Sequence, residues 1–327
     1  MLEIIASFIK QAIIQGIPLL YGSTGEILTE KSGNLNLGIP GIMYIGGISG
    51  VIGAYFYEKS VVDINPFLCV MIPLLCSILG SVLMALIYCF LTVTLRANQN
   101  VTGLALTTFG VGVGNFFGGS LSSLFGEGGS ISLIRTGACF KATLPFASKL
   151  GLFGDTFLSF GFLAYLAIVI ALFCSWFLNS TRAGLSLRAV GESPATADAA
   201  GINVTKYKYL ATCVGAAIAG LGGLYFIMDY IGGAWTNGGF GDRGWLAIAL
   251  VIFALWKPKY SILGSILFGG LYIVYLYIPG LSRSSQEIFK MLPYVVTIVV
   301  LIVLSIRNRR ENQPPESLGL SYFREDR

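Results

Sequence analysis

The chain has 327 residues, of which 55% are hydrophobic and only 11% are charged, and its formal net charge is +5. Soluble domains carry about 25% charged residues, so this composition excludes an ordinary soluble globule. Uncharged runs at residues 66–95 and 97–126 are each longer than the roughly 20 apolar residues that a membrane-spanning helix needs. We therefore expect an all-α fold, a polytopic transmembrane helical bundle.

The residue types also exclude several kinds of chemistry. The chain has no histidine, which removes the commonest general base and metal ligand. All cysteines except Cys139 lie in apolar stretches, so neither a disulfide framework nor a metal site is indicated. Lysine and arginine lie mostly in short loops and near the C-terminus, which indicates orientation in the bilayer rather than nucleic-acid binding. We expect no metal and no cofactor on this chain.

Charge-free segments between turn residues predict about nine spans, and eight or ten remain compatible with the pattern. Basic residues in the loops after the fifth, seventh and ninth spans place these loops inside, which requires an odd number of spans with the N-terminus outside. Residues 1–306 then form one transmembrane domain, with an outer loop at 120–157, an inner loop at 179–207 and a cytoplasmic tail at 307–327. The predicted spans are 4–22, 38–56, 66–94, 101–119, 158–178, 208–230, 244–256, 261–278 and 290–306.

Two segments do not have the pattern of simple spanning helices. Residues 25–41 contain glycines, asparagines and a proline, and residues 231–241 are glycine-rich and precede an apolar stretch that is too short to cross alone. Irregular backbone at membrane depth has to be buried in protein or line a wet cavity, and broken helices often mark a transport path. We expect one or two broken or re-entrant segments; loops outside the hydrocarbon region are the alternative.

Amide and aromatic side chains are the candidates for lining a substrate path. Asn34 and Asn36 lie in the first irregular segment, and Asn115, Phe116 and Phe117 lie in the fourth predicted span. Amides offer both hydrogen-bond donors and acceptors, and aromatic rings stack on flat ligands. The competing interpretation is that the two phenylalanines pack in the core or against lipid.

The predicted inner loop contains a short capped helix. Ser193 is placed as its N-cap, Pro194 takes the first helical position, and Gly201 supplies a left-handed stop. Alanines between them leave a surface on which another protein can pack closely, so we expect a docking element; a well-capped connector is the alternative. The docking element comprises Glu192, Ser193, Pro194, Ala195, Thr196, Ala197, Asp198, Ala199, Ala200 and Gly201.

Three motifs resemble a known family of transporters. Residues 187–194 and 199–208 are similar to the cytoplasmic coupling loop of ABC-importer permeases of the ribose and branched-chain amino acid superfamily. Residues 25–41, and residues 241–250 with 256–258, resemble the branch that transports nucleosides and simple sugars with basic-membrane-lipoprotein-type binding proteins. The similarity covers nearly the whole chain in order and excludes the tail.

The resemblance implies a non-catalytic permease subunit of a bacterial ABC importer in the cell (inner) membrane, moving nucleosides or simple sugars. It implies two ATP-binding subunits that bind ATP and Mg²⁺, a second and non-identical permease, and an extracytoplasmic substrate-binding lipoprotein. Residues 192–201 would couple to the ATP-binding subunit. Family members commonly have an acidic residue where this chain has Pro40 and often an apolar one at Asn34, so the role of that acidic group is not carried over.

Two other classes of function compete with this interpretation. A stand-alone secondary transporter or channel for a small polar solute would usually show ionisable groups inside the membrane, and the long predicted spans are nearly free of them. An intramembrane hydrolase or transferase would need a general acid and base, and the chain offers neither histidine nor a clustered acid pair in its predicted spans.

Overall fold

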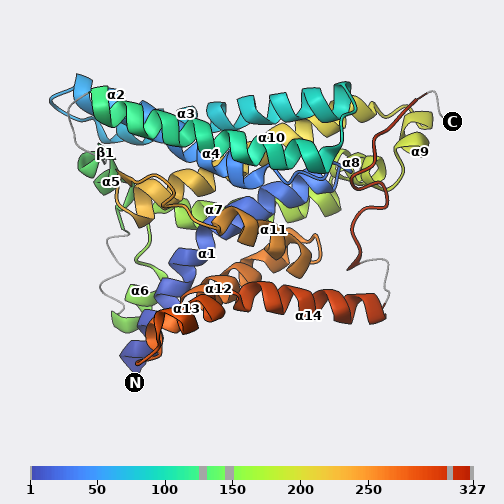
Figure 1. Cartoon of the computed structure of the whole chain (residues 1–327). Coiled ribbons are helices and arrows are strands. Elements are labelled where there is room, and N and C mark those ends of the chain that lie inside the picture. The colour runs from blue at the N-terminus through green and yellow to red at the C-terminus, as the bar shows by residue number, and fades with distance from the viewer. Residues whose placement is uncertain (1, 125–130, 144–150, 308–311, 325–327) are drawn as a thin grey trace.

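The computed structural model describes residues 2–124, 131–143, 151–307 and 312–324 (Figure 1). The middle of the predicted outer loop 120–157 and parts of the predicted tail 307–327 lie outside the described residues. Within the described residues, eight helical segments are long and apolar enough to cross a membrane. This number falls within the predicted range and confirms a polytopic helical bundle.

The elements follow one another as a helical chain with a single short pair of strands among the described residues. The long helices are α1 (Leu2–Glu30), α2 (Ile39–Ser60), α3 (Pro66–Cys89) continuing as η1 (Phe90–Thr94), α4 (Gln99–Leu124), α7 (Phe162–Ser180), α10 (Val204–Tyr225) continuing as η3 (Phe226–Tyr230), α12 (Pro258–Ile273) continuing as η4 (Val274–Tyr277), and α13 (Arg283–Lys290) followed by α14 (Leu292–Arg307). The short elements are β1 (Ile131–Ser132), α5 (Ile134–Phe140), α6 (Gly151–Phe157), α8 (Arg182–Glu192), α9 (Pro194–Ala199), β2 (Ala234–Trp235) and α11 (Arg243–Phe253). Strands β1 and β2 pair antiparallel, with Ile131 opposite Trp235.

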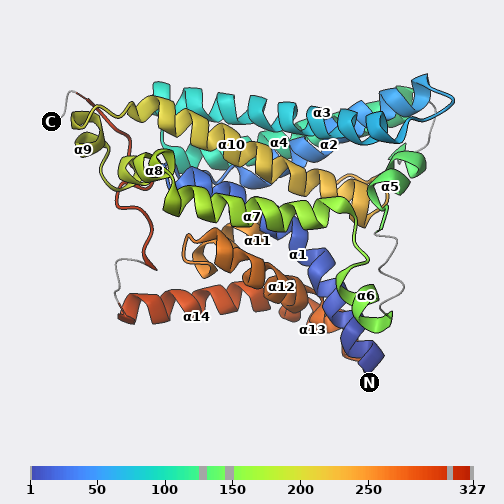
Figure 2. The same cartoon turned by 180° about the vertical axis from the view of Figure 1, so that it is seen from behind.

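The loops gather at two opposite ends of the bundle (Figures 1 and 2). The N-terminus, α5 and α6 lie at one end, and α8, α9 and the C-terminal segment lie at the other. Helix α11 has 11 residues, about 16 Å, whereas the hydrocarbon core is about 30 Å thick. Helix α11 is therefore too short to cross alone, as predicted. The odd number of spans and the outside position of the N-terminus stay predictions.

Several helix boundaries differ from the sequence prediction by a few residues, and two of these differences affect the irregular segments. Helix α1 continues to Glu30, eight residues beyond the predicted end of the first span, and only residues 31–38 interrupt the path to α2. The glycines that were expected to end the helix serve close packing instead: a β-carbon on Gly25 would lie 2.2 Å from the carbonyl oxygen of Gly215. The predicted span 244–256 is the short helix α11, which ends at Phe253.

Glycines allow α1 and α2 to approach α10 more closely than side chains would permit. A β-carbon on Gly223 of α10 would lie 1.9 Å from the carbonyl oxygen of Met43, and one on Gly46 of α2 would lie 2.5 Å from the Cα of Gly220. Close backbone approach at small residues is a major source of helix association in lipid. Helix α10 is therefore the element against which α1 and α2 are positioned.

We predict that Gly223→Leu destabilises the bundle, because the new side chain would overlap the backbone of α2. Overpacking costs typically 1–3 kcal/mol, and we expect the thermal unfolding midpoint of the purified protein to fall accordingly. The matched control is Gly112→Ala, whose β-carbon would meet no atom within 4 Å. Equal unfolding midpoints for Gly223→Leu and Gly112→Ala would contradict this packing.

Candidate substrate path and coupling surface

The break between α1 and α2 is buried and is held by polar side chains. The backbone N–H of Asn36 donates to Glu26 Oε1 at 3.1 Å, and Asn36 Oδ1 accepts from the N–H of Gly38 at 2.9 Å. Asn34 Nδ2 donates to Thr212 Oγ1 at 3.1 Å. Because buried backbone groups outside a helix need other partners, these side chains satisfy and fix the break.

This placement shows how Asn34 and Asn36 are held, and their role in a substrate path stays a prediction. Both residues are 0% exposed, and their bonded atoms are committed to the protein's own groups. The other amide atoms, Asn34 Oδ1 and Asn36 Nδ2, are buried and have no hydrogen-bond partner among the described residues. The sequence indicated correctly that the segment is irregular and rich in amides. The local sequence pattern could not show that both amide side chains are buried in the protein.

The turn between α11 and α12 is anchored on the same end of α1. Trp256 Nε1 donates a hydrogen bond to Glu30 Oε2, and both residues are buried. Leu255 and Trp256 adopt left-handed backbone angles, with φ of 56° and 53°, so the turn is tight. Glu26 and Glu30 were missed as functional residues because the predicted span stopped before them, although their spacing of four places both on one helix face.

Helix α4 presents a stripe of small and polar residues that the rest of the described structure leaves uncovered. Thr108 is exposed and Asn115 is half-buried, and a β-carbon on Gly112 or Gly119 would meet no atom within 4 Å. Their spacing of four, three and four places them on one helix face. Lipid chains cannot satisfy polar groups, so this stripe suits water, a polar solute or a second protein chain.

Segment 231–242 extends this stripe. Thr236, Asn237 and Gly238 are exposed, and Tyr44 joins them to α4: its hydroxyl donates to Asn115 Oδ1 and accepts from the N–H of Gly238 at 2.9 Å. We call the uncovered surface formed by Thr108, Gly112, Asn115, Gly119, Thr236, Asn237 and Gly238 the path face.

The aromatic residues beside Asn115 divide between two positions. At about 100° per residue around a helix, Phe116 borders the path face and Phe117 lies across α4 from it. Their rings pack edge to face with centroids 5.4 Å apart, and both are exposed. Asn115 therefore belongs to the path face, Phe116 lies at its margin, and Phe117 lies away from it.

The inner loop folds into the short helix that its sequence predicts. Ser193 caps α9 by accepting from the N–H of Thr196, Pro194 is the first helical residue, and Gly201 has φ of +83°. The exposed part of the expected docking element is smaller than the whole segment. Its exposed residues are Glu192, Ala195, Thr196, Ala199, Ala200 and Gly201, which we call the coupling surface.

The other residues of the docking element hold α9 in place. Ala197 is buried and packs with Val190 and Val204. The Asp198 carboxylate accepts from the Tyr322 hydroxyl at 2.9 Å and pairs with Arg324 at 3.1 Å. Ser193 and Pro194 are half-buried at the start of the helix.

The C-terminal segment 312–324 connects the coupling surface to the break. The backbone N–H and the hydroxyl of Ser317 both donate to the carbonyl of Gly191, at 3.0 and 2.6 Å. The N–H of Gly319 donates to the carbonyl of Gly33 at 3.2 Å, and Lys257 donates to Asn312 Oδ1 at 3.0 Å. The polar composition of this segment gave no sign of these contacts.

Burial also affects the charge beside this junction. It lowers the pKa of Lys31, which follows α1, and the Glu192 carboxylate partly offsets this effect. The basic group at the end of α1 is thus linked electrostatically to the first residue of the coupling surface.

Comparisons with known proteins agree with these features. A family model described as a branched-chain amino acid transport system permease component matches residues 8–301. The chain is 32% identical to the nucleoside ABC transporter permease protein NupC of Lactococcus lactis subsp. cremoris, over 90% of both chains. It is 27% identical to the guanosine ABC transporter permease protein NupQ of Bacillus subtilis, over 91% of this chain and 92% of that one. A Haloferax volcanii chain provisionally named as a glucose ABC transporter permease protein is 30% identical, over 98% of both chains.

We predict that Trp256→Phe lowers stability, because it leaves the buried Glu30 carboxylate without its indole donor. Loss of one partner of a buried polar group costs about 1–3 kcal/mol, which a thermal unfolding curve of the purified protein would detect. The control is Trp245→Phe, since no described residue accepts a hydrogen bond from that indole. If both variants unfolded at the wild-type temperature, the hydrogen bond between Trp256 and Glu30 would not stabilise the fold.

Proposed function

The chain belongs to the family of branched-chain amino acid transport system permease components, and from this premise we propose which solute it carries and how it is driven. It is a membrane-spanning permease subunit of an ABC transporter. Our proposal is that it imports nucleosides. The uncovered polar path face within a membrane-spanning bundle is the structural observation that carries the proposal.

Nucleosides fit the chemistry of the path face. Asn115 and Asn237 supply amides, and Thr108 and Thr236 supply hydroxyls, so the surface offers donors and acceptors without a cluster of charge. Two relatives are named for nucleoside and guanosine transport. A simple sugar is the second candidate, because another relative is named for glucose and the same groups suit hydroxyl-rich solutes.

The path face is one wall of the proposed path, and a second permease subunit supplies the other. We propose that this partner is a non-identical chain. Two ATP-binding subunits bind ATP and Mg²⁺ and carry out hydrolysis, and an extracytoplasmic lipoprotein delivers the solute. The sequence contains no Gly-x-x-x-x-Gly-Lys-Ser/Thr phosphate loop, which supports a non-catalytic role for this chain.

We place the end with α8 and α9 in the cytoplasm and the N-terminus outside, in a bacterial cell membrane. Arg182, Arg188, Lys206, Lys257 and Lys259 all lie in or beside the turns at this end. An excess of basic residues marks the cytoplasmic side of membrane proteins.

The coupling surface is where we expect the ATP-binding subunit to dock. Its small side chains allow close packing, and α9 is fixed by Ala197 and by the Asp198 contacts beneath it. A movement of the docked subunit would therefore shift α8 and α9 as a rigid body. The hydrogen bonds of segment 312–324 with Gly191 and Gly33 give this movement a route to the break.

We predict that Ala199→Arg weakens binding of the ATP-binding subunit by at least about tenfold, or about 1.4 kcal/mol, because Ala199 is exposed on the coupling surface. Co-purification of the tagged subunit with detergent-solubilised permease measures the effect. The same substitution at Ala142, exposed at the opposite end, serves as the control. Ala197→Arg should instead lower folded yield, since Ala197 is buried. If the Ala199→Arg permease bound the ATP-binding subunit as tightly as the wild type does, α9 would not be part of the docking site.

We predict that Gly112→Trp abolishes guanosine uptake, because an indole on the path face would fill the route. The measurement is ATP-dependent uptake of labelled guanosine into proteoliposomes that contain both permeases, the ATP-binding subunits and the cognate binding protein. Leu83→Trp is the control, since Leu83 is exposed on α3.

Two outcomes would contradict two separate parts of the proposal, the position of the path and the identity of the solute. Uptake by Gly112→Trp at the wild-type rate would refute the proposal that the path face lines the substrate path. Uptake of glucose but not of guanosine by the wild-type assembly would refute the nucleoside assignment and favour the sugar.

A further inference from the structure

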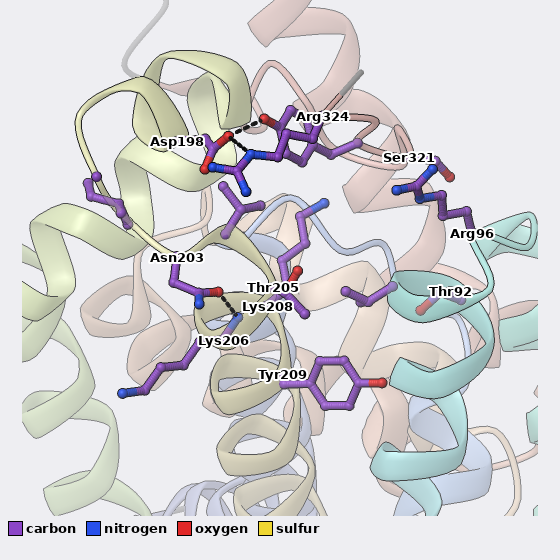
Figure 3. A pocket seen from close by; sticks show the side chains of 15 residues that line it. Thr92, Arg96, Asp198, Asn203, Thr205, Lys206, Lys208, Tyr209, Ser321 and Arg324 are labelled. Carbon is purple, nitrogen blue, oxygen red and sulfur yellow. Dashed lines mark hydrogen bonds and ion pairs between the residues drawn. The ribbon is translucent and has the colours of Figure 1, made fainter. Parts of the chain in front are cut away.

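A basic cavity lies at the proposed cytoplasmic end, outside the path face and next to the coupling surface, whose Gly201 contributes to its lining. It has a volume of about 680 Å³ and lies between the end of η1, the start of α10 and the C-terminal segment (Figure 3). Four cationic side chains but a single carboxylate, Asp198, line it. The cationic residues are Arg96, Lys206, Lys208 and Arg324.

Lys208 is the residue whose charge is hardest to explain without a ligand. It is only 3% exposed, and no described residue forms an ion pair or hydrogen bond with its ammonium group. The single lining carboxylate is already paired with Arg324. Lys208 thus lines the cavity without an opposite charge of its own, beside three other cationic side chains, so the cavity is suited to an anion.

An apolar groove adjoins the basic cavity at the start of α10. It has a volume of about 770 Å³, and Phe173 and Phe177 of α7 face Leu210 and Val214 of α10 along it. The two hollows share lining residues, among them Lys206. Figure 3 shows the Lys206 side chain extending away from Arg96, on the far side of the basic cavity.

The two hollows together define the chemistry of the occupant. The groove runs along membrane-spanning parts of α7 and α10, and the basic cavity lies where α10 begins. A ligand that fills both needs an anionic head next to a hydrocarbon chain. Basic pockets between helix ends at the cytoplasmic side commonly bind anionic lipid headgroups.

We propose that this junction binds one anionic phospholipid, with an acyl chain in the groove between α7 and α10, its phosphate beside Lys206 where the two hollows meet, and its headgroup directed into the basic cavity that Lys208 lines. The lipid brings negative charge to a cavity that is lined by four cationic side chains and a single carboxylate, and it fills apolar surface beside the coupling surface. A free phosphate shares the headgroup chemistry but would leave the groove empty. The site is independent of which solute the transporter carries.

The test uses the purified transporter complex after detergent delipidation and exposure to vesicles with equal amounts of phosphatidylglycerol and phosphatidylcholine. Native mass spectrometry counts the lipids that remain bound. We expect selective retention of phosphatidylglycerol by the wild type, and a loss of at least about tenfold in Lys208→Met and in Lys206→Gln. Lys259→Gln, an exposed lysine at the same end but outside both hollows, should retain the lipid.

A second pair of measurements distinguishes a lipid from a free phosphate. Val214→Trp should fill the groove and reduce phosphatidylglycerol retention while all four cationic residues remain. Inorganic phosphate in excess should not displace the lipid from the wild type. Equal retention of the two lipids, unchanged retention in Lys206→Gln, or displacement by inorganic phosphate would each overturn the proposal.

Discussion

Buried backbone groups have to find their hydrogen-bond partners inside the protein, and the break between α1 and α2 is built around this constraint. Glu26 and Asn36 satisfy the broken backbone, and Glu30 of the same helix receives the indole N–H of Trp256. One end of α1 therefore fixes both the start of α2 and the turn from α11 to α12. Away from these irregular segments, α1, α2 and α10 pack closely through glycines.

The structure joins the coupling surface to the path face through a short series of contacts. Segment 312–324 bonds to Gly191 behind the coupling surface and to Gly33 in the break. The break leads directly into α2, whose Tyr44 bonds to both Asn115 and Gly238 on the path face. Each of these contacts is a defined target for a double-mutant cycle.

The sequence predicts those features that depend on local pattern. Charge-free runs located the spans, and the Ser193, Pro194 and Gly201 signals located α9, because hydropathy and capping act over a few residues. The inward placement of Asn34 and Asn36, the pairing of Glu30 with Trp256 and the packing of segment 312–324 depend on residues far apart in the chain. The path face could be recognised only when α4 and segment 231–242 were seen together.

The position of segment 312–324 in the chain has a consequence for biosynthesis. Its partners Gly33 and Gly191 are synthesised long before it, and membrane helices before it are inserted while the segment is still being translated. The end of the bundle that contains α8 and α9 therefore cannot form its contacts with this segment until these late residues have left the ribosome. Proteins elongate at about 5–20 residues per second, so the coupling surface spends several seconds without its contacts to segment 312–324. Nascent chains that stop before this segment never form these contacts.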